Sequence, residues 1–146
     1  MASDIVTIAD AVTAALNAKL PDWGYSANAV RRNTPTYDLS ELGTPRFTVV
    51  PISREVKLAG KGGSLVMTAP RIDIDIRYHT GNDQTTNDQL TELSEQIAEH
   101  FLGGVAGLTA CLSAESSVVF QDDKMIEQGV FAVAVSLTFS IGRTPR

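Results

Sequence analysis

The alternation of apolar and polar residues is clearest from Arg71 to Tyr78, which read Arg-Ile-Asp-Ile-Asp-Ile-Arg-Tyr. Side chains alternate across a β-strand, so the three isoleucines and Tyr78 share one face, while Asp73, Asp75 and Arg77 share the other. The pattern therefore predicts a strand that packs one face on an apolar core.

A helical period replaces this alternation after a turn-rich connector at residues 80–83. From Thr86 to Leu102 the apolar residues are spaced to form one stripe on a helix; they are Leu90, Leu93, Ile97 and Phe101. Thr86 and Gln89 suggest a capping box, and the glycines at 103–104 a C-terminal stop. A one-faced strand followed by a one-striped helix predicts a helix lying on a sheet, because neither element can bury its apolar face alone.

The remaining elements are predicted with the same two periods and with glycine and proline as boundaries. A first helix runs from Ser3 or Asp4 to Leu20, before Pro21. Strands are expected at 27–32, 46–51, 54–58, 116–120 and 131–141. Pro51 marks the end of a strand or an edge of the sheet. A turn is expected at 121–124, and residues 108–112 fit a short helix or a strand. Trp23 and Tyr25 are expected to close the edge of the core.

This order of elements predicts an α+β fold, with two helices packed on one face of a mostly antiparallel sheet. The length of 146 residues suits one domain over residues 1–146 that buries roughly 70% of its unfolded surface. Residues 57–67 contain a glycine-rich stretch, Gly-Lys-Gly-Gly-Ser at 60–64, which predicts a mobile hairpin loop.

Composition and charge exclude some functions. A net charge of −5 argues against a protein that binds nucleic acid by neutralising phosphates, although it allows DNA to pass without being gripped. The single Cys111 excludes an internal disulfide framework. Asp4 and Asp10 interrupt what would be the apolar part of a signal peptide, and no run approaches the ~20 apolar residues of a membrane span.

Candidate chemistry is sparse. Asp73 and Asp75 project on the same side of one strand about 7 Å apart, a separation that suits paired carboxylates but equally a solvated strand face. His79, His100 and Cys111 lack the close spacing of a zinc site. The glycine-rich stretch is not a phosphate loop, because its lysine precedes the glycine pair and no helix follows. We therefore expect no enzyme, no cofactor and no metal.

Two surfaces suggest assembly instead. The strand at 131–141 has a second face of small, nearly uncharged residues, and we take Ala132, Ala134, Ser136 and Thr138 as a candidate subunit interface. Beyond the glycine-rich stretch lies an apolar run that a monomer gains little by exposing. The candidate partner-docking loop accordingly comprises Lys57, Lys61, Leu65, Val66 and Met67.

Two blocks of the chain are similar to a family of small bacteriophage virion proteins. They are Pro-Thr-Tyr-Asp-Leu-Ser-Glu-Leu at 35–42 and Arg-Phe-Thr-Val-Val-Pro at 46–51. The succession of the strand at 72–78, an acidic helix and a terminal alternating strand resembles the same family, so the similarity covers most of the chain. The family is the neck and tail-terminator group of long-tailed phages, of siphovirus or myovirus type.

The resemblance implies a tail-terminator-like structural virion protein that forms a ring, usually a hexamer. Such a ring caps the tail tube and joins it to the head, with the tail tube protein and a neck or connector protein as partners and assembly in the bacterial host cytoplasm. Asp73 and Asp75 would be candidates to line a lumen through which DNA slides. A head-side neck or head-completion protein stays an alternative, as does, from another class, a small α+β enzyme or ligand-binding domain.

Overall fold

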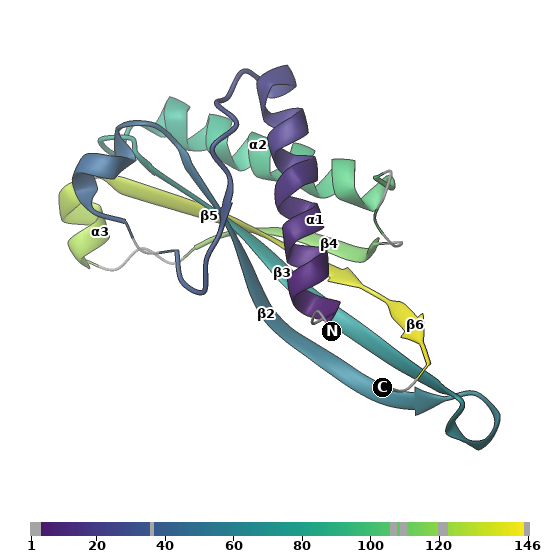
Figure 1. The fold of residues 1–146 in the computed structure, drawn as a ribbon. Helices are drawn as coiled ribbons and strands as arrows, with labels where there is room; N and C mark the ends of the chain where they lie inside the picture. Colours follow the sequence, from purple (N-terminus) through teal and green to yellow (C-terminus); the bar gives the residue numbers. More distant parts are fainter. Residues whose placement is uncertain (1–3, 36, 106–107, 109–110, 120–122, 145–146) are drawn as a thin grey trace.

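The computed structural model describes residues 4–35, 37–105, 108, 111–119 and 123–144. It has an α+β fold, in which two main helices pack against a six-stranded, mostly antiparallel mixed sheet (Figure 1). The fold class expected from the sequence is therefore confirmed.

The described elements follow one another in the order α1 (Asp4–Lys19), η1 (Leu20–Trp23), β1 (Val30–Arg31), η2 (Leu39–Gly43), β2 (Arg46–Ala59), η3 (Lys61–Gly63), β3 (Leu65–His79), α2 (Gln84–Leu102), β4 (Cys111–Val118), α3 (Asp123–Gln128), β5 (Val130–Phe139) and β6 (Ile141–Arg143). The strand order across the sheet is β1-β2-β3-β5-β4, and β6 also pairs with β3. Only β1 and β2 are parallel among the described pairs.

The core lies between the sheet and the two helices. Helix α1 packs on β2 and β3, and α2 packs on β4 and β5, so together they cover one face of the sheet. The three isoleucines of the alternating strand are fully buried there, as are the apolar stripe of α2 and the alternate valines of β5. Each such side chain contributes about 1.5–3 kcal/mol by its burial. Trp23 and Tyr25 are partly buried against this core, as predicted.

Helix α2 begins earlier than the sequence suggested. Asp83 is its N-cap, because the carboxylate accepts hydrogen bonds from the Thr86 amide at 3.0 Å and the Thr86 hydroxyl at 2.6 Å. The predicted start at Thr86, with a capping box to Gln89, is therefore wrong; aspartate can fill the same role as threonine three residues upstream. At the other end Gly103 is the C-cap, and its amide donates to the Glu99 carbonyl.

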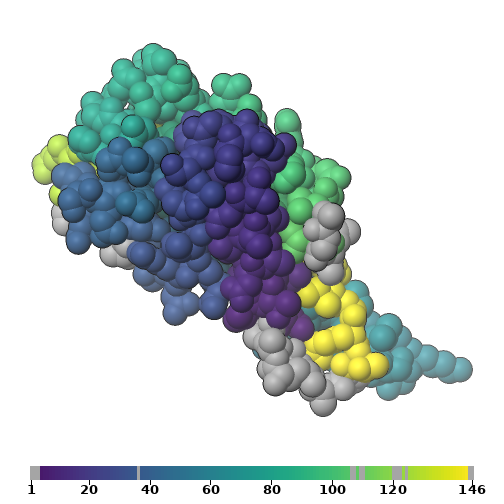
Figure 2. Space-filling model, turned by 45° about the horizontal axis from the view of Figure 1, so that its top comes forward, coloured from purple at the N-terminus to yellow at the C-terminus, as the bar shows by residue number. Residues whose placement is uncertain are grey.

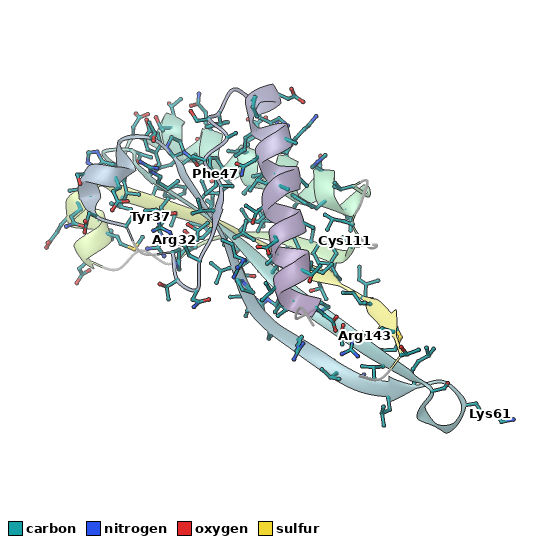
Figure 3. All side chains as sticks on the ribbon, in the orientation of Figure 1. Arg32, Tyr37, Phe47, Lys61, Cys111 and Arg143 are labelled. Atoms are coloured by element: carbon teal, nitrogen blue, oxygen red, sulfur yellow. The ribbon has the colours of Figure 1, made fainter. Side chains whose placement is uncertain are left out.

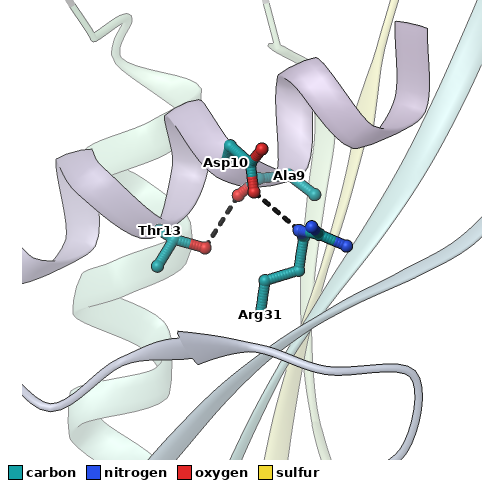
Figure 4. Close-up of polar contacts among 4 residues, drawn as sticks. All are labelled: Ala9, Asp10, Thr13 and Arg31. Atoms are coloured by element: carbon teal, nitrogen blue, oxygen red, sulfur yellow. Dashed lines mark hydrogen bonds and ion pairs between the residues drawn. The ribbon is translucent and has the colours of Figure 1, made fainter. Parts of the chain in front are cut away.

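The short strand β1 is held to α1 by side chains (Figure 4). Arg31 Nε lies 2.6 Å from Asp10 Oδ1. The Asn17 amide donates to the Ala29 carbonyl and accepts from the Ala29 amide, at 3.0 and 2.8 Å. These contacts fix the chain where it crosses from the helix layer to the edge of the sheet.

Strands β2 and β3 are longer than predicted and form a hairpin that extends past the rest of the fold (Figure 1). The predicted strands at 46–51 and 54–58 are one strand, so Pro51 does not end it. The edge prediction for Pro51 holds, since β1 pairs with β2 only as far as Val49 and leaves Pro51 without a second neighbour. The register shifts between Pro51 and Ser53, which leaves Ile52 as the extra residue of a β-bulge.

Strands β5 and β6 continue one register along β3. Thr138 pairs with Arg71, and Ile141 pairs with Thr68, three residues further along each strand. The interruption lies where Pro70 would pair, and proline has no N–H to donate to a ladder. The long strand predicted at 131–141 is therefore present, but it is divided into two segments opposite Pro70.

The region before β5 differs from the prediction. Strand β4 begins at Cys111, five residues before the predicted start at Ser116, so residues 111–112 of the segment 108–112 lie in a strand. Residues 109–110 lie outside the described part of the chain. The predicted turn at 121–124 fails in its second half, where Asp123 begins helix α3. Residues 120–122 lie outside the described part of the chain.

An ion pair joins the two ends of the described chain beside the hairpin, where Arg143 of β6 lies opposite Val66 of β3. Arg143 Nε of β6 lies 2.9 Å from Asp4 Oδ2 of α1, with side chains 24% and 12% exposed. Because both groups are largely removed from water, the interaction is screened less than a surface pair. It fixes the N-terminus of α1 to the strand that supports the hairpin.

Replacing Arg143 with Met should lower the free energy of unfolding by roughly 1–3 kcal/mol, since a largely buried carboxylate loses a charged partner. Urea denaturation measures the change. The double variant Asp4→Asn, Arg143→Met should lose less than the sum of the single losses. Additive losses would show that the two side chains do not stabilise each other.

Candidate functional site

Two surfaces stand out in the described structure, and they lie in different parts of the sheet. The first, which we call the open-face patch, is on the face away from α1 and α2 and comprises Asp73, Asp75, Ala134, Ser136 and Thr138. The second, which we call the arm, is the projecting hairpin of residues 53–70. The arm includes the predicted partner-docking loop, whereas the open-face patch combines residues of two separate stretches of sequence.

The open-face patch arises from strand register. Asp73 pairs with Ser136 and Asp75 with Ala134, and paired residues of antiparallel strands project on the same side. The candidate lumen carboxylates and the candidate interface residues, predicted as two surfaces, therefore share one surface. Sequence alone does not reveal this, because the two strands are more than 50 residues apart and their register is set by the fold.

Part of the open face is covered by the chain itself. The Tyr37 hydroxyl lies 2.6 Å from Thr48 Oγ1, and the Arg32 guanidinium lies 4.7 Å from the centre of the Tyr37 ring. Thr48 has no exposed surface, and neighbouring η2 packs against β3. Figure 3 shows Arg32 and Tyr37 close together on this side of the molecule, away from the tip of the arm.

This cover buries Asp75. Its side chain is 9% exposed and forms an ion pair with Arg77 Nε at 2.9 Å. Burial raises the pKa of the Asp75 carboxyl; the Arg77 charge and hydrogen bond oppose the increase, and the Asp73 charge adds to it. Asp75 is therefore a structural carboxyl in the subunit and has little surface with which to line a channel.

Asp73 keeps more contact with solvent. Arg71 Nε lies 3.5 Å from Asp73 Oδ1, within range of an ion pair but too far for a well-formed hydrogen bond. Arg71 Nη2 also lies 3.4 Å from Ser136 Oγ. Asp73, Arg71 and Ser136 thus form a polar group in which the carboxylate charge is partly neutralised by its neighbour.

The candidate interface residues also divide into a buried one and three that are partly exposed. Ala132 is 0% exposed in the subunit, so it has no surface to give to a neighbouring copy. Ala134, Ser136 and Thr138 are half-buried and stay candidates. A small residue on a predicted strand face looks the same whether it lies under a loop of its own chain or under another subunit, which is why the sequence did not separate them.

The arm is exposed over most of its length. On the side continuous with the helix-covered face, Leu58 is 72% and Val56 55% exposed, whereas Val66 is only 7% exposed. Leu65 and Lys61 are exposed and Met67 is half-buried. The run at 65–67, expected to follow a loop, is the first part of β3, so its apolar character is that of a strand.

The tip of the arm is a defined turn. Gly60, Gly62 and Gly63 all have positive φ, at 76°, 68° and 71°, and the Gly63 amide donates to the Gly60 carbonyl. Other residues rarely adopt these angles, which explains the glycine-rich sequence. Lys61 projects from this turn (Figure 3), while Lys57 is paired with Glu55 at 2.9 Å. The mobility of the loop stays a prediction.

Sequence reasoning missed three residues of the arm that the structure brings together. Arg54, Val56 and Leu58 project on one side of the ribbon, because each pairs with a residue of β3 on that side. All three are exposed. The signal in the sequence is the alternation of Arg-Glu-Val-Lys-Leu at 54–58, which predicts a strand but does not show whether a core covers its apolar side.

An apolar groove lies between α1 and the C-terminal end of α2 with the residues that follow it, Val105 and Leu108, and has a volume of about 490 Å³. Its lining includes Ala11, Ala14, Ala15 and Ala18 on α1 and His100 at the end of α2. Burial, and then the nearby Lys19 charge, lowers the pKa of His100. The neutral imidazole that results suits the apolar lining, and its ring also packs edge-on to Trp23, with ring centres 5.6 Å apart.

In the described part of the chain, no three His, Cys, Asp or Glu side chains are close enough together to hold a metal ion. None of the described helices combines the length and apolarity needed to cross a membrane. Burial raises the pKa of the Cys111 thiol, which donates to the Ser113 carbonyl at 3.2 Å. A raised pKa makes a thiol a poorer nucleophile at neutral pH.

No family model matches this chain, and a search of curated proteins finds no relative.

Replacing Asp75 with Asn should raise the thermal unfolding midpoint at pH 7, since burial of the charge outweighs its attraction to Arg77. The folded-state pKa of Asp75 is raised, so ionisation costs stability above that value. The gain should shrink as the pH falls through the folded pKa and vanish below about 3.9, the unfolded value. A lower midpoint at pH 7 would show that the attraction to Arg77 dominates.

Proposed function

We propose that the chain is a structural virion protein, one subunit of a ring that terminates a bacteriophage tail tube and joins it to the head or neck. The observation that carries the proposal is the arm. It is built from two strands that leave the core, and it exposes apolar side chains that the subunit's own helices do not reach. The family resemblance of the two sequence blocks supplies the biological setting.

The physical argument is that the arm is incomplete in the subunit. A two-stranded ribbon is at best marginally stable in water. Among the described strands, only β6 pairs with this ribbon as a third strand, over three residues of β3. The exposed area of Val56 and Leu58 would stabilise a complex at about 25 cal/mol per Å² buried. A partner surface that covers one side of the ribbon therefore stabilises both the arm and the assembly.

The open-face patch contributes a second candidate contact. Ala134, Ser136 and Thr138 are small, and burying them against another surface costs little desolvation compared with charged side chains. DNA would pass through such a ring without being bound specifically. Since Asp75 is buried, any lining role on this face falls to Asp73.

A ligand-binding domain is the second candidate function, and the groove between α1 and α2 favours it. Its volume lies within the range of small-molecule sites, and its lining is mostly apolar. The two functions predict different states in solution: a ring, or a monomer with a bound metabolite.

Native mass spectrometry of the purified chain should show a closed oligomer, with six copies of the 15.6 kDa subunit as the expected species. Negative-stain images should show rings with a central opening. The same rings should bind purified tail tubes at one end. A monomer carrying a co-purified small molecule, with no rings at high concentration or in particles, would instead support the ligand-binding function.

Limited trypsin digestion should cut the free subunit first after Lys61, because this lysine projects from the tip of the arm while Lys57 lies in a paired strand. Assembly should slow that cut by about tenfold or more. The Lys61→Gln variant identifies the band, since it should lose the early product only. Equal rates in free and assembled protein would mean that the arm tip does not contact a partner.

A further inference from the structure

The arm and the rest of the subunit carry opposite net charge. Residues 53–70 contain three Lys or Arg and one Glu, a net charge of +2. The other 128 residues contain nine Lys or Arg and sixteen Asp or Glu, a net charge of −7. A positive, apolar projection on a negative body suggests that the arm's partner is another negative surface.

The chain itself presents such a surface on α2. Four carboxylates lie along its solvent face, at spacings of four, three and four residues: Asp88, Glu92, Glu95 and Glu99. All four are exposed, and among the described residues none has a Lys or Arg nitrogen within ion-pair distance. Like charges at this spacing cost a helix about 0.2–0.5 kcal/mol per pair. Cations from a partner would remove that cost.

The groove gives the same helix layer an apolar component. It opens between α1 and the C-terminal end of α2, where His100, the residue after Glu99, lines it together with Lys19 of α1. The acidic face of α2 and the apolar groove therefore approach each other at the C-terminal end of this helix. Figure 2 shows the side of the molecule on which α1 lies, with the arm projecting beyond it.

We infer that the arm of one subunit docks on the helix layer of a second copy of the same chain. Val56 and Leu58 would enter the groove, while Arg54 and Lys61 would pair with carboxylates of α2. This inference rests on the proposed function and names the partner of the arm within the ring. The occupant is a second copy because both the charge and the apolar character of the arm are complemented on this chain.

The geometry prevents the arm of a subunit from contacting α2 of the same subunit. The arm continues β2 and β3, whereas α2 packs on β4 and β5, and the arm points away from α2 (Figures 1 and 2). The seven arm residues of β2 span about 23 Å, enough to cross a neighbour's helix of about 10–12 Å diameter. The contact is therefore head-to-tail, the type that generates a ring when its rotation closes.

A charge exchange tests the contact. The arm variant Arg54→Glu, Lys61→Glu and the helix variant Glu95→Lys, Glu99→Lys should each be monomeric in native mass spectrometry, because like charges face each other. An equimolar mixture should recover the oligomer with the two variants alternating, since every arm then meets a helix of opposite charge. Recovery in the mixture excludes misfolding as the cause of the single failures.

A matched control comes from the other side of the ribbon. Arg54→Glu and Lys57→Glu change the charge equally, but Lys57 projects on the opposite face and pairs with Glu55. Arg54→Glu should weaken assembly at least tenfold and Lys57→Glu by less than threefold. Wild-type assembly should also weaken as salt rises from 50 to 500 mM, values at which the screening length falls from about 14 to about 4 Å.

The outcomes separate this inference from the proposed function. If the wild-type chain forms rings and both the arm variant and the helix variant assemble equally well, the proposed ring stands but the arm contact is wrong. Rings from the arm variant that no longer bind tail tubes would assign the arm to the tube instead, which also overturns it. If the arm variant assembles normally but no longer binds duplex DNA, the arm is a nucleic-acid-binding element and the arm contact is wrong. A wild-type chain that is monomeric alone and in particles would overturn both.

Discussion

The limited reach of the helix layer is the constraint on which the rest of the structure depends. Strand β3 has 15 residues, and its side chains on the helix side are buried along nearly all of it, including Val66 and Thr68 in the arm. Strand β6 flanks this half of β3: Arg143 pairs with Val66 and holds the first turn of α1 through Asp4. In the described structure this cover stops at β3, because Val56 and Leu58 of β2 are exposed although their partners in β3 are buried. The arm therefore has one covered strand and one exposed strand.

Local pattern predicted the body well and the arm poorly, for a physical reason. The isoleucines of β3 and the stripe of α2 are buried as their periods indicate, because each period reflects one covered face. Val56 and Leu58 have the same alternation but no cover, so their exposure depends on where α1 ends in space. For Pro51 the sequence left a strand end and an edge open, because the effect of a proline depends on whether a neighbouring strand needs its N–H; the structure places it on an edge. The N-cap of α2 was missed because Asp83 and Thr86 are both good caps.

The candidate site was only partly predictable. The small residues of β5 and the aspartates of β3 were both identified, yet their meeting on one face follows from a register between distant strands. Tyr37 contacts Thr48, the residue paired with buried Asp75, and the segment that carries Tyr37 has no periodic pattern. Such a segment can be located only from the fold. It changes the role of Asp75 from a solvated carboxylate to a buried one with a raised pKa.

In the proposed ring, each subunit has one arm and one acidic helix face, so every copy gives one contact and receives one. The number of subunits is then set by the angle between the arm and α2, since a head-to-tail contact closes only at a rotation that divides a full turn. The sheet transmits that angle, because β2 and β3 run without a break from the core into the arm. The bulge at Ile52 is the one place where the register of this hairpin changes, and bulges bend and twist the strand that carries them. Pro51, adjacent to the bulge, restricts the backbone there. In the proposed ring, the irregular residue at the base of the arm would therefore help to set the angle at which each arm meets the next subunit.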